Sequence, residues 1–92
     1  MAAQFDAELD RVIAALDHET RRDLMAFYVS EATSPAAVAQ NLKVDFAQLA
    51  YHTRVLVDVG AIQPVAHLRP DWTYAATEVG HMAYVKVTGE AE

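Results

Sequence analysis

The sequence predicts a mainly helical domain that carries one small β-hairpin, an α+β fold. Three observations lead to this prediction. Apolar residues recur at helical spacing through the first sixty residues, capping residues stand where helices should begin, and the pattern changes after Gly60 to that of two short strands. With 92 residues, the chain has room for a single domain, residues 1–92, with one modest core.

The first two predicted helices span about residues 5–16 and 18–31, with Asp17 as the N-cap of the second. Arg21 and Arg22 lie near the start of the second helix, on its more polar side. The apolar positions of the two helices follow the helical period and should face the core: Phe5, Leu9, Val12, Ile13, Leu16, Leu24, Met25, Phe27 and Tyr28.

The third predicted helix is short and covers residues 35–42. Ser34 supplies a hydroxyl cap, and Pro35 follows at the first helical position, where its missing N–H costs nothing. Val38 and Leu42 should face inward. A tight turn follows that has no glycine, so Asn41 or Lys43 must adopt the backbone conformation that the turn needs.

The fourth predicted helix runs over residues 46–59, with Asp45 as its N-cap and Gly60 ending it. A hairpin over residues 61–76 comes next, with its tip near residues 68–71. Pro64 has no N–H for a ladder, which predicts that the first strand has an unpaired edge.

A last helix is expected over residues 78–87, begun by Thr77 and Glu78. The predicted order is therefore helix, helix, short helix, tight turn, helix, hairpin, helix. Two helices joined by a turn of three or four residues and followed by a two-stranded wing form the winged helix-turn-helix arrangement.

Three segments of the sequence form a pattern by their order and spacing: residues 17–24, residues 34–39 with 42–45, and residues 49–56 followed by Asp58, Gly60, Ala61 and Ile62. Together they resemble the ArsR-like family of transcriptional regulators, and the resemblance covers roughly residues 10–80. It implies a dimeric DNA-binding regulator that pairs through its first and last helices, here residues 5–16 and 78–87. Lys43 stands where the family usually has glycine, and the cysteine-based metal-sensing motif of the founding members is missing.

Cysteine is absent, which excludes disulfides and thiolate metal sites and suggests a cytoplasmic setting. No run of about 18 apolar residues occurs, so no membrane span is expected. The four histidines form no convincing ligand set, and no nucleophile stands beside a plausible base. We therefore expect no metal site, no cofactor and no enzymatic activity.

The fourth helix supplies most of the candidate contacts with DNA. If Leu49 faces the core, Ala47, Tyr51, Arg54 and Asp58 lie on the opposite face at 100° per residue. Arg54 can pair with guanine or hold a phosphate, and Gln48 can read adenine. The full candidate set is Lys43, Ala47, Gln48, Tyr51, His52, Arg54 and Arg69.

Two of these candidates have a structural role as the alternative to a DNA contact. His52 falls at the boundary of the buried face, so it either contacts a phosphate or packs against the third helix. Arg69, at the tip of the hairpin, either enters a minor groove or is a solvated turn residue.

Two functions remain open at this stage. The first is a homodimeric, sequence-specific regulator with residues 46–59 in the major groove of double-stranded DNA and residues 61–76 on the backbone or in the minor groove. The second is a winged-helix protein-interaction module, such as an anti-repressor or a partner of a regulator, with little DNA affinity. The net charge of −6 favours the second, because phosphate binding normally needs a basic surface.

Overall fold

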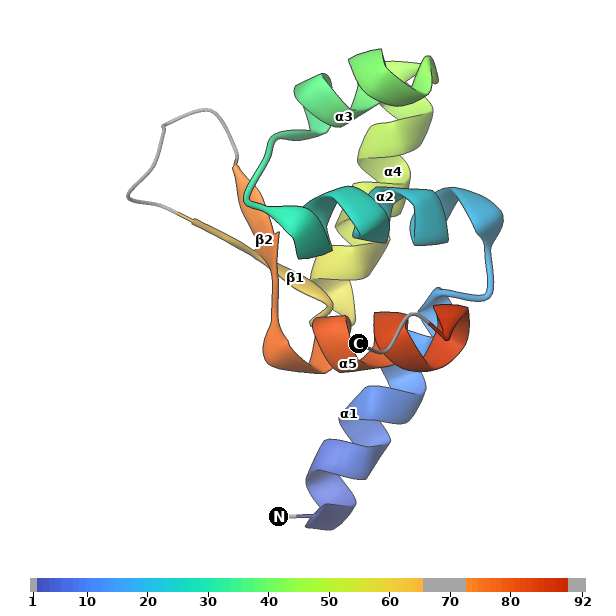
Figure 1. Ribbon diagram of the computed structural model, residues 1–92, viewed down its shortest axis with the longest axis vertical. Coiled ribbons are helices and arrows are strands. Elements are labelled where there is room, and N and C mark those ends of the chain that lie inside the picture. The colour runs from blue at the N-terminus through green and yellow to red at the C-terminus, as the bar shows by residue number, and fades with distance from the viewer. Residues whose placement is uncertain (1, 66–72, 90–92) are drawn as a thin grey trace.

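The computed structural model describes residues 2–65 and 73–89, with side chains from residue 6 onward. Within these ranges the chain is mainly helical and carries one small antiparallel hairpin, which confirms the predicted α+β class. In chain order the elements are α1 (Ala2–Ala15), α2 (Glu19–Ser30), α3 (Pro35–Leu42), α4 (Phe46–Asp58), β1 (Ile62–Pro64), β2 (Tyr74–Ala76) and α5 (Glu78–Thr88) (Figure 1).

Three of the predicted N-caps are confirmed. Each cap side chain accepts a hydrogen bond from the backbone N–H three residues further on, which satisfies a donor that the first helical turn leaves unpaired. The donor–acceptor distances are 3.3, 3.2 and 3.0 Å at Ser34, Asp45 and Thr77. The starts of α3, α4 and α5 are therefore set by local chemistry that can be read from the sequence.

The predicted cap of α2 is wrong by one residue. Asp17 still belongs to the last turn of α1, because its N–H donates to the carbonyl of Ala14 at 3.2 Å. The chain becomes extended only at His18, whose Nδ1 accepts the N–H of Thr20 at 3.2 Å. His18 is therefore the N-cap of α2.

Left-handed backbone ends both α3 and α4. Lys43 has φ 58° and donates its N–H to the carbonyl of Ala39, so it adopts the conformation that the turn needs. Gly60 has φ 86° and follows the cap residue Val59, and Ala61 donates to the carbonyl of Leu56 at 2.8 Å. This bonding is the Schellman ending of a helix, and α4 stops at Asp58, one residue before the predicted end.

The hairpin is shorter than predicted within the described residues. Ile62 pairs with Ala76 and Pro64 with Tyr74, and β1 has no second partner strand there, so the predicted unpaired edge at Pro64 is confirmed. On the other side of β2, Thr33 and Tyr74 exchange backbone hydrogen bonds of 2.9 and 2.8 Å, a bridge that the sequence did not suggest. The predicted tip lies outside the described residues.

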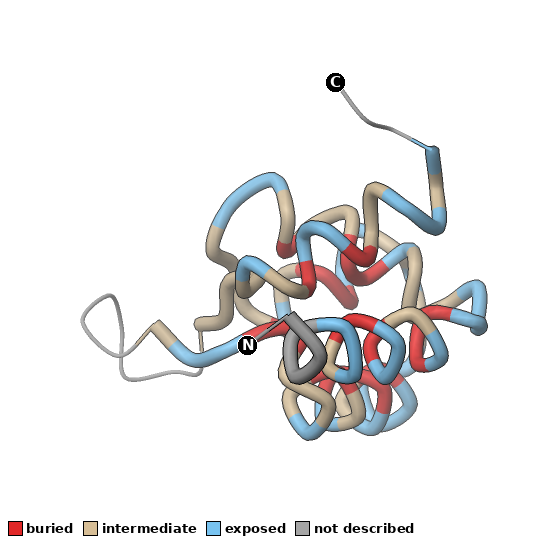
Figure 2. The backbone as a smooth tube through the Cα atoms, turned by 90° about the horizontal axis from the view of Figure 1, so that it is seen from below, coloured by how far each residue is buried: buried red, intermediate tan, exposed pale blue. Residues whose placement is uncertain are grey.

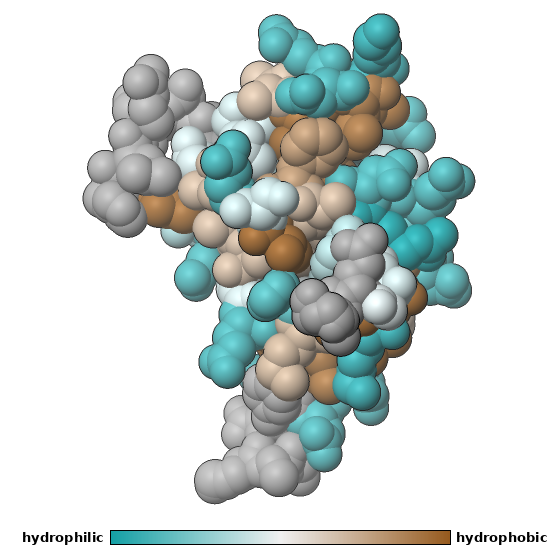
Figure 3. Space-filling view, viewed as in Figure 1, coloured by the Kyte–Doolittle hydropathy of each residue, from teal (hydrophilic) through white to brown (hydrophobic). Residues whose placement is uncertain are grey.

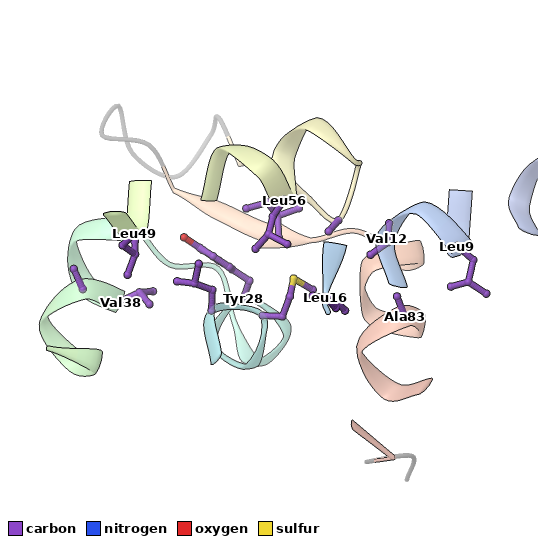
Figure 4. Packing of buried hydrophobic residues seen from close by; sticks show 13 residues of the cluster. Leu9, Val12, Leu16, Tyr28, Val38, Leu49, Leu56 and Ala83 are labelled. Atoms are coloured by element: carbon purple, nitrogen blue, oxygen red, sulfur yellow. The ribbon is translucent and has the colours of Figure 1, made fainter. Parts of the chain in front are cut away.

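The core runs the length of the molecule, from α3 and α4 through α2 to α1 and α5 (Figure 4). In Figure 2, the buried stretches of the chain lie where the elements meet. The predicted inward residues of α1 and α2 are largely confirmed, although Ile13 and Phe27 are only partly buried and the Phe5 side chain lies outside the described residues. The largest fully buried side chains are those of Val12, Leu16, Leu24, Met25, Tyr28, Val38, Leu49, Leu56 and Ile62.

Close backbone contact joins the hairpin to α5. A Cβ atom on Gly80 would overlap the carbonyl of Ala61, so only glycine allows this approach. The hydroxyl of Thr77 donates to the carbonyl of Gly60 at 2.6 Å while it also caps α5. These contacts fix the end of α4, the hairpin and α5 as one unit.

None of the described helices has both the length and the apolar character needed to cross a bilayer.

Candidate nucleic-acid interface

Helix α4 turns one face into the core and the other to solvent, as the sequence predicted. Leu49 and Leu56 are fully buried, and Thr53 is nearly so. The hydroxyl of Thr53 lies 3.4 Å from that of Tyr28 on α2, and burial raises the pKa of this tyrosine. We call the exposed residues on the opposite side the outer face of α4: Ala47, Gln48, Tyr51, Arg54 and Asp58.

Tyr51 and Arg54 are free to contact a partner. The Tyr51 side chain is 60% exposed, and its ring lies edge-on against the His52 ring with centroids 5.1 Å apart. Neither the Tyr51 hydroxyl nor the Arg54 guanidinium forms a hydrogen bond or ion pair within the described residues. The outer face therefore presents two groups that a partner can reach. One is the hydroxyl of Tyr51, whose ring rests against that of His52, and the other is the guanidinium of Arg54.

The surroundings of the outer face are electrically balanced. Lys43 and Arg54 bring two positive charges, and Asp45 and Asp58 bring two negative ones, all on exposed side chains. The carboxylate of Asp45 is partly engaged, because it accepts the N–H of Gln48 at the start of the helix. In a chain with a net charge of −6, this is a locally neutral surface.

His52 does not lie on that surface. Its side chain is only 4% exposed, so the predicted phosphate contact is not available to it in this structure. Besides the Tyr51 ring, its partners are on α2 and the α2 cap: Nδ1 accepts from Nε of Arg21 at 3.1 Å, and the ring packs on that of His18 with centroids 4.5 Å apart. Burial lowers the pKa of His52, and the neighbouring His18 and Arg21 lower it further.

Arg21 and Arg22 hold the end of α1. Nη1 of Arg21 donates to the carbonyl of Ala15 at 3.1 Å, and Nη1 of Arg22 donates to that of Leu16 at 2.9 Å. The last carbonyls of a helix lack partners within the helix and carry a partial negative charge, so two guanidinium groups satisfy and stabilise them. This role was not predicted, although two arginines shortly after the end of a predicted helix do indicate that its last carbonyls can be paired by side chains.

Of the other predicted site residues, five are described by the structure and one is not. Lys43, Ala47, Gln48, Tyr51 and Arg54 lie along the turn and the exposed side of α4, so the structure brings them together. Arg69 lies outside the described residues, and its place at a minor groove stays a prediction. Within the described residues, no three histidine, aspartate or glutamate side chains gather into a possible metal site.

No protein-family model, curated protein or solved structure was found to match this chain.

Proposed function

We propose that this protein is a winged helix-turn-helix regulator that binds double-stranded DNA as a homodimer. Helices α3 and α4 are joined by the three residues 43–45, and the β1–β2 hairpin follows α4 directly. This order supports α4 as a recognition helix in the major groove, with the hairpin as the wing on the backbone or in the minor groove.

The observation that carries the proposal is the pair Tyr51 and Arg54 on the exposed side of α4, whose hydroxyl and guanidinium groups have no hydrogen-bond or ion-pair partner among the described residues. Arg54 can form a bidentate pair with guanine or hold a phosphate, and Gln48 at the start of α4 can read adenine. Ala47 presents a methyl group that suits the methyl of thymine. Because Leu49 and Leu56 anchor α4 in the core, these side chains are presented without further ordering of the backbone.

The charge distribution sets how such binding should depend on salt. Lys43 and Arg54 are the cations nearest the proposed contact surface among the described residues, and the acidic α1 would lie away from DNA. The salt dependence of binding scales with the number of phosphates neutralised, so a small number of contacts gives a shallow slope. Sequence readout by α4 would then contribute more of the affinity than nonspecific attraction does.

Helices α1 and α5 are the proposed dimer surface. They pack against each other and cross in Figure 1. Met82 and Val87 of α5 are 41% and 36% exposed. Val87 also lines a groove of about 340 Å³ together with Ile13 of α1 and Arg22 of α2. Burying such side chains in a second copy is favourable, and it would present two α4 helices to half-sites about one helical turn apart.

Binding to a random-library and genomic DNA pool tests the proposal, with fluorescence anisotropy at low and physiological salt and the mass in solution measured alongside. We expect enrichment of a palindromic sequence by a dimer. Replacing Tyr51 and Arg54 by alanine together should weaken binding to that sequence by about 10-fold or more. Asp23→Ala, at an exposed position of α2 outside both the outer face and the proposed dimer helices, is the control, and the mechanism fails if the outer-face variant binds as well as this control.

A second candidate function is a protein-interaction module with little DNA affinity. It is favoured by the net charge of −6, by Asp58 on the outer face, and by Phe46, whose side chain is 54% exposed at the start of α4. Absence of DNA binding even at low salt would favour this candidate over the regulator.

A further inference from the structure

A groove runs along one flank of α4, beside the outer face. It has a volume of about 560 Å³ and is bounded by α4, the start of α3 and β2. This volume is within the usual range of small-molecule sites. Much of its wall is apolar and comes from Pro35, Phe46, Ala50, Val57 and Tyr74.

Phe46 marks the groove as a place for an apolar partner. Its aromatic side chain is 54% exposed and lines the groove, although it stands at the first position of α4, where any polar residue would serve. The opposite wall includes Tyr74, whose ring is held edge-on by the buried Tyr28 at 6.3 Å. A flat apolar ligand between α4 and β2 would have several of its sides shielded from water. Hydrophobic residues also form patches among hydrophilic ones on the face drawn in Figure 3.

The charges at the groove favour an anion. At 100° per residue, Arg54 lies about 60° from the mean direction of Phe46, Ala50 and Val57, and Asp58 lies about 100° away. Both side chains line the groove, but Arg54 leaves α4 closer to the direction of the groove, and its guanidinium has no hydrogen-bond or ion-pair partner within the described residues.

The start of α3 adds to this preference. Its first turn lines the groove and carries the positive end of the helix dipole, a smaller effect that acts in the same direction as Arg54. A single negative charge is the best match, since a second one would meet Asp58. A guanidinium group is the side chain best shaped to pair with a carboxylate.

We propose that this groove binds a small amphipathic carboxylate with an aromatic body, and that the bound ligand withdraws Arg54 from DNA. The apolar walls take the rings and Arg54 takes the carboxylate. The first half of this proposal stands on the groove alone. The second half rests on the proposed DNA binding, because Arg54 belongs both to the groove and to the outer face of α4. A ligand there would act as an effector by direct competition.

The binding half is tested with three probes that share one ring system: 2-naphthoate, the neutral 2-naphthamide and the cationic 2-naphthylmethylamine. Each is titrated into the full chain, with amide chemical shifts as the readout. We expect 2-naphthoate to bind saturably, at least about 10-fold more tightly than the amide, with the largest shifts at residues 34, 36, 46–58 and 74. The amine should bind most weakly.

Two matched pairs of variants locate the site. Ala50→Leu fills the groove and should abolish binding, whereas Ala47→Leu, on the outer face and away from the groove, should leave it unchanged. Arg54→Gln should reduce the affinity for 2-naphthoate to that for the amide, and Lys86→Gln should not. Equal binding of the acid and the amide, tighter binding of the amine, or full binding by Ala50→Leu would each overturn the proposed site.

The regulatory half uses the DNA sequence selected above. Saturating 2-naphthoate should weaken DNA binding by about 10-fold or more, and 2-naphthamide at the same concentration should not. Binding of 2-naphthoate by a protein that binds no DNA would refute the regulator and leave the ligand site standing. Binding of DNA and 2-naphthoate together, without competition, would refute the effector role alone.

Discussion

Arg21 donates its Nε–H to Nδ1 of His52 at 3.1 Å, and this hydrogen bond joins the start of α2 to the middle of α4. The same guanidinium group also donates to the carbonyl of Ala15 at the end of α1. One side chain therefore connects three helices. The arrangement requires a neutral His52 with its proton on Nε2, because Nδ1 must accept.

This requirement predicts that the fold loses stability in acid. The pKa of His52 lies below its ordinary value of 6.5, chiefly because the ring is buried and also because His18 and Arg21 stand beside it. Above pH 6.5 the ring is neutral in both states, so its contribution is complete. As the pH falls below 6.5, the unfolded chain takes up a proton that the folded chain resists, and the free energy of unfolding decreases until the pH passes the folded pKa.

Urea denaturation between pH 8 and pH 5 measures this effect. His52→Gln keeps a side-chain oxygen that can accept from Arg21 and does not titrate, so the loss of stability between pH 7 and pH 5 should be smaller in the variant. His81→Gln, at an exposed position of α5, is the control and should retain the wild-type slope. Identical pH profiles for wild type and His52→Gln would contradict the prediction.

Removing the Arg21 side chain should destabilise the fold by about 2–3 kcal/mol. The variant Arg21→Ala leaves both Nδ1 of His52 and the carbonyl of Ala15 without the guanidinium N–H that each accepts. Arg11→Ala, at an exposed position of α1, should cost less than about 0.5 kcal/mol. Equal thermal or urea unfolding midpoints for the wild type and Arg21→Ala would show that Arg21 does not connect the helices in solution.

Replacing Lys43 by glycine should stabilise the protein by about 1 kcal/mol. Lys43 holds φ 58° at the turn between α3 and α4, and a left-handed conformation costs a residue with a side chain roughly 1–2 kcal/mol. Glycine removes that cost but loses some entropy on folding. Lys43→Ala removes the charge while keeping the strain, so only the glycine variant should have a higher melting temperature.

Gly80→Ala should destabilise the fold by about 2–3 kcal/mol, because its methyl group would overlap the Ala61 carbonyl and force α5 away from the hairpin. Gly89→Ala is a matched comparison. Gly89 has φ 73° but open space around its Cα, so alanine there should cost only the backbone strain, about 1 kcal/mol. A larger loss at Gly89 than at Gly80, measured by chemical denaturation, would argue against the close approach.

The parts of the fold that could be predicted depend on interactions within a few residues. Ser34, Asp45 and Thr77 cap helices through bonds to the third residue on, and Leu49 and Leu56 follow the period of one helix. Such contacts are nearly the same in any protein, so the element order, the bounds of α3 and the solvent-facing side of α4 all followed from the sequence.

Apart from the α2 cap and the end of α4, which are each off by one residue, the missed features depend on residues far apart in the chain. His52 and Arg21 are 31 positions apart, and the helical period alone left His52 on the boundary between core and surface. The bridge between Thr33 and Tyr74, which ties the hairpin to the segment before α3, likewise has no local signal.

By itself, the sequence determined the helices, three of their N-caps and the glycine at the end of α4, because these arise from steric and hydrogen-bonding preferences of neighbouring residues. Only the tertiary structure decided which polar side chains remain available for binding. It buried His52 and engaged Arg21 and Arg22 on the end of α1, and it left the Tyr51 hydroxyl and the Arg54 guanidinium without a hydrogen-bond partner among the described residues. The physical reason is that availability depends on which buried donors and acceptors need partners once the helices have packed, and that packing involves the whole chain.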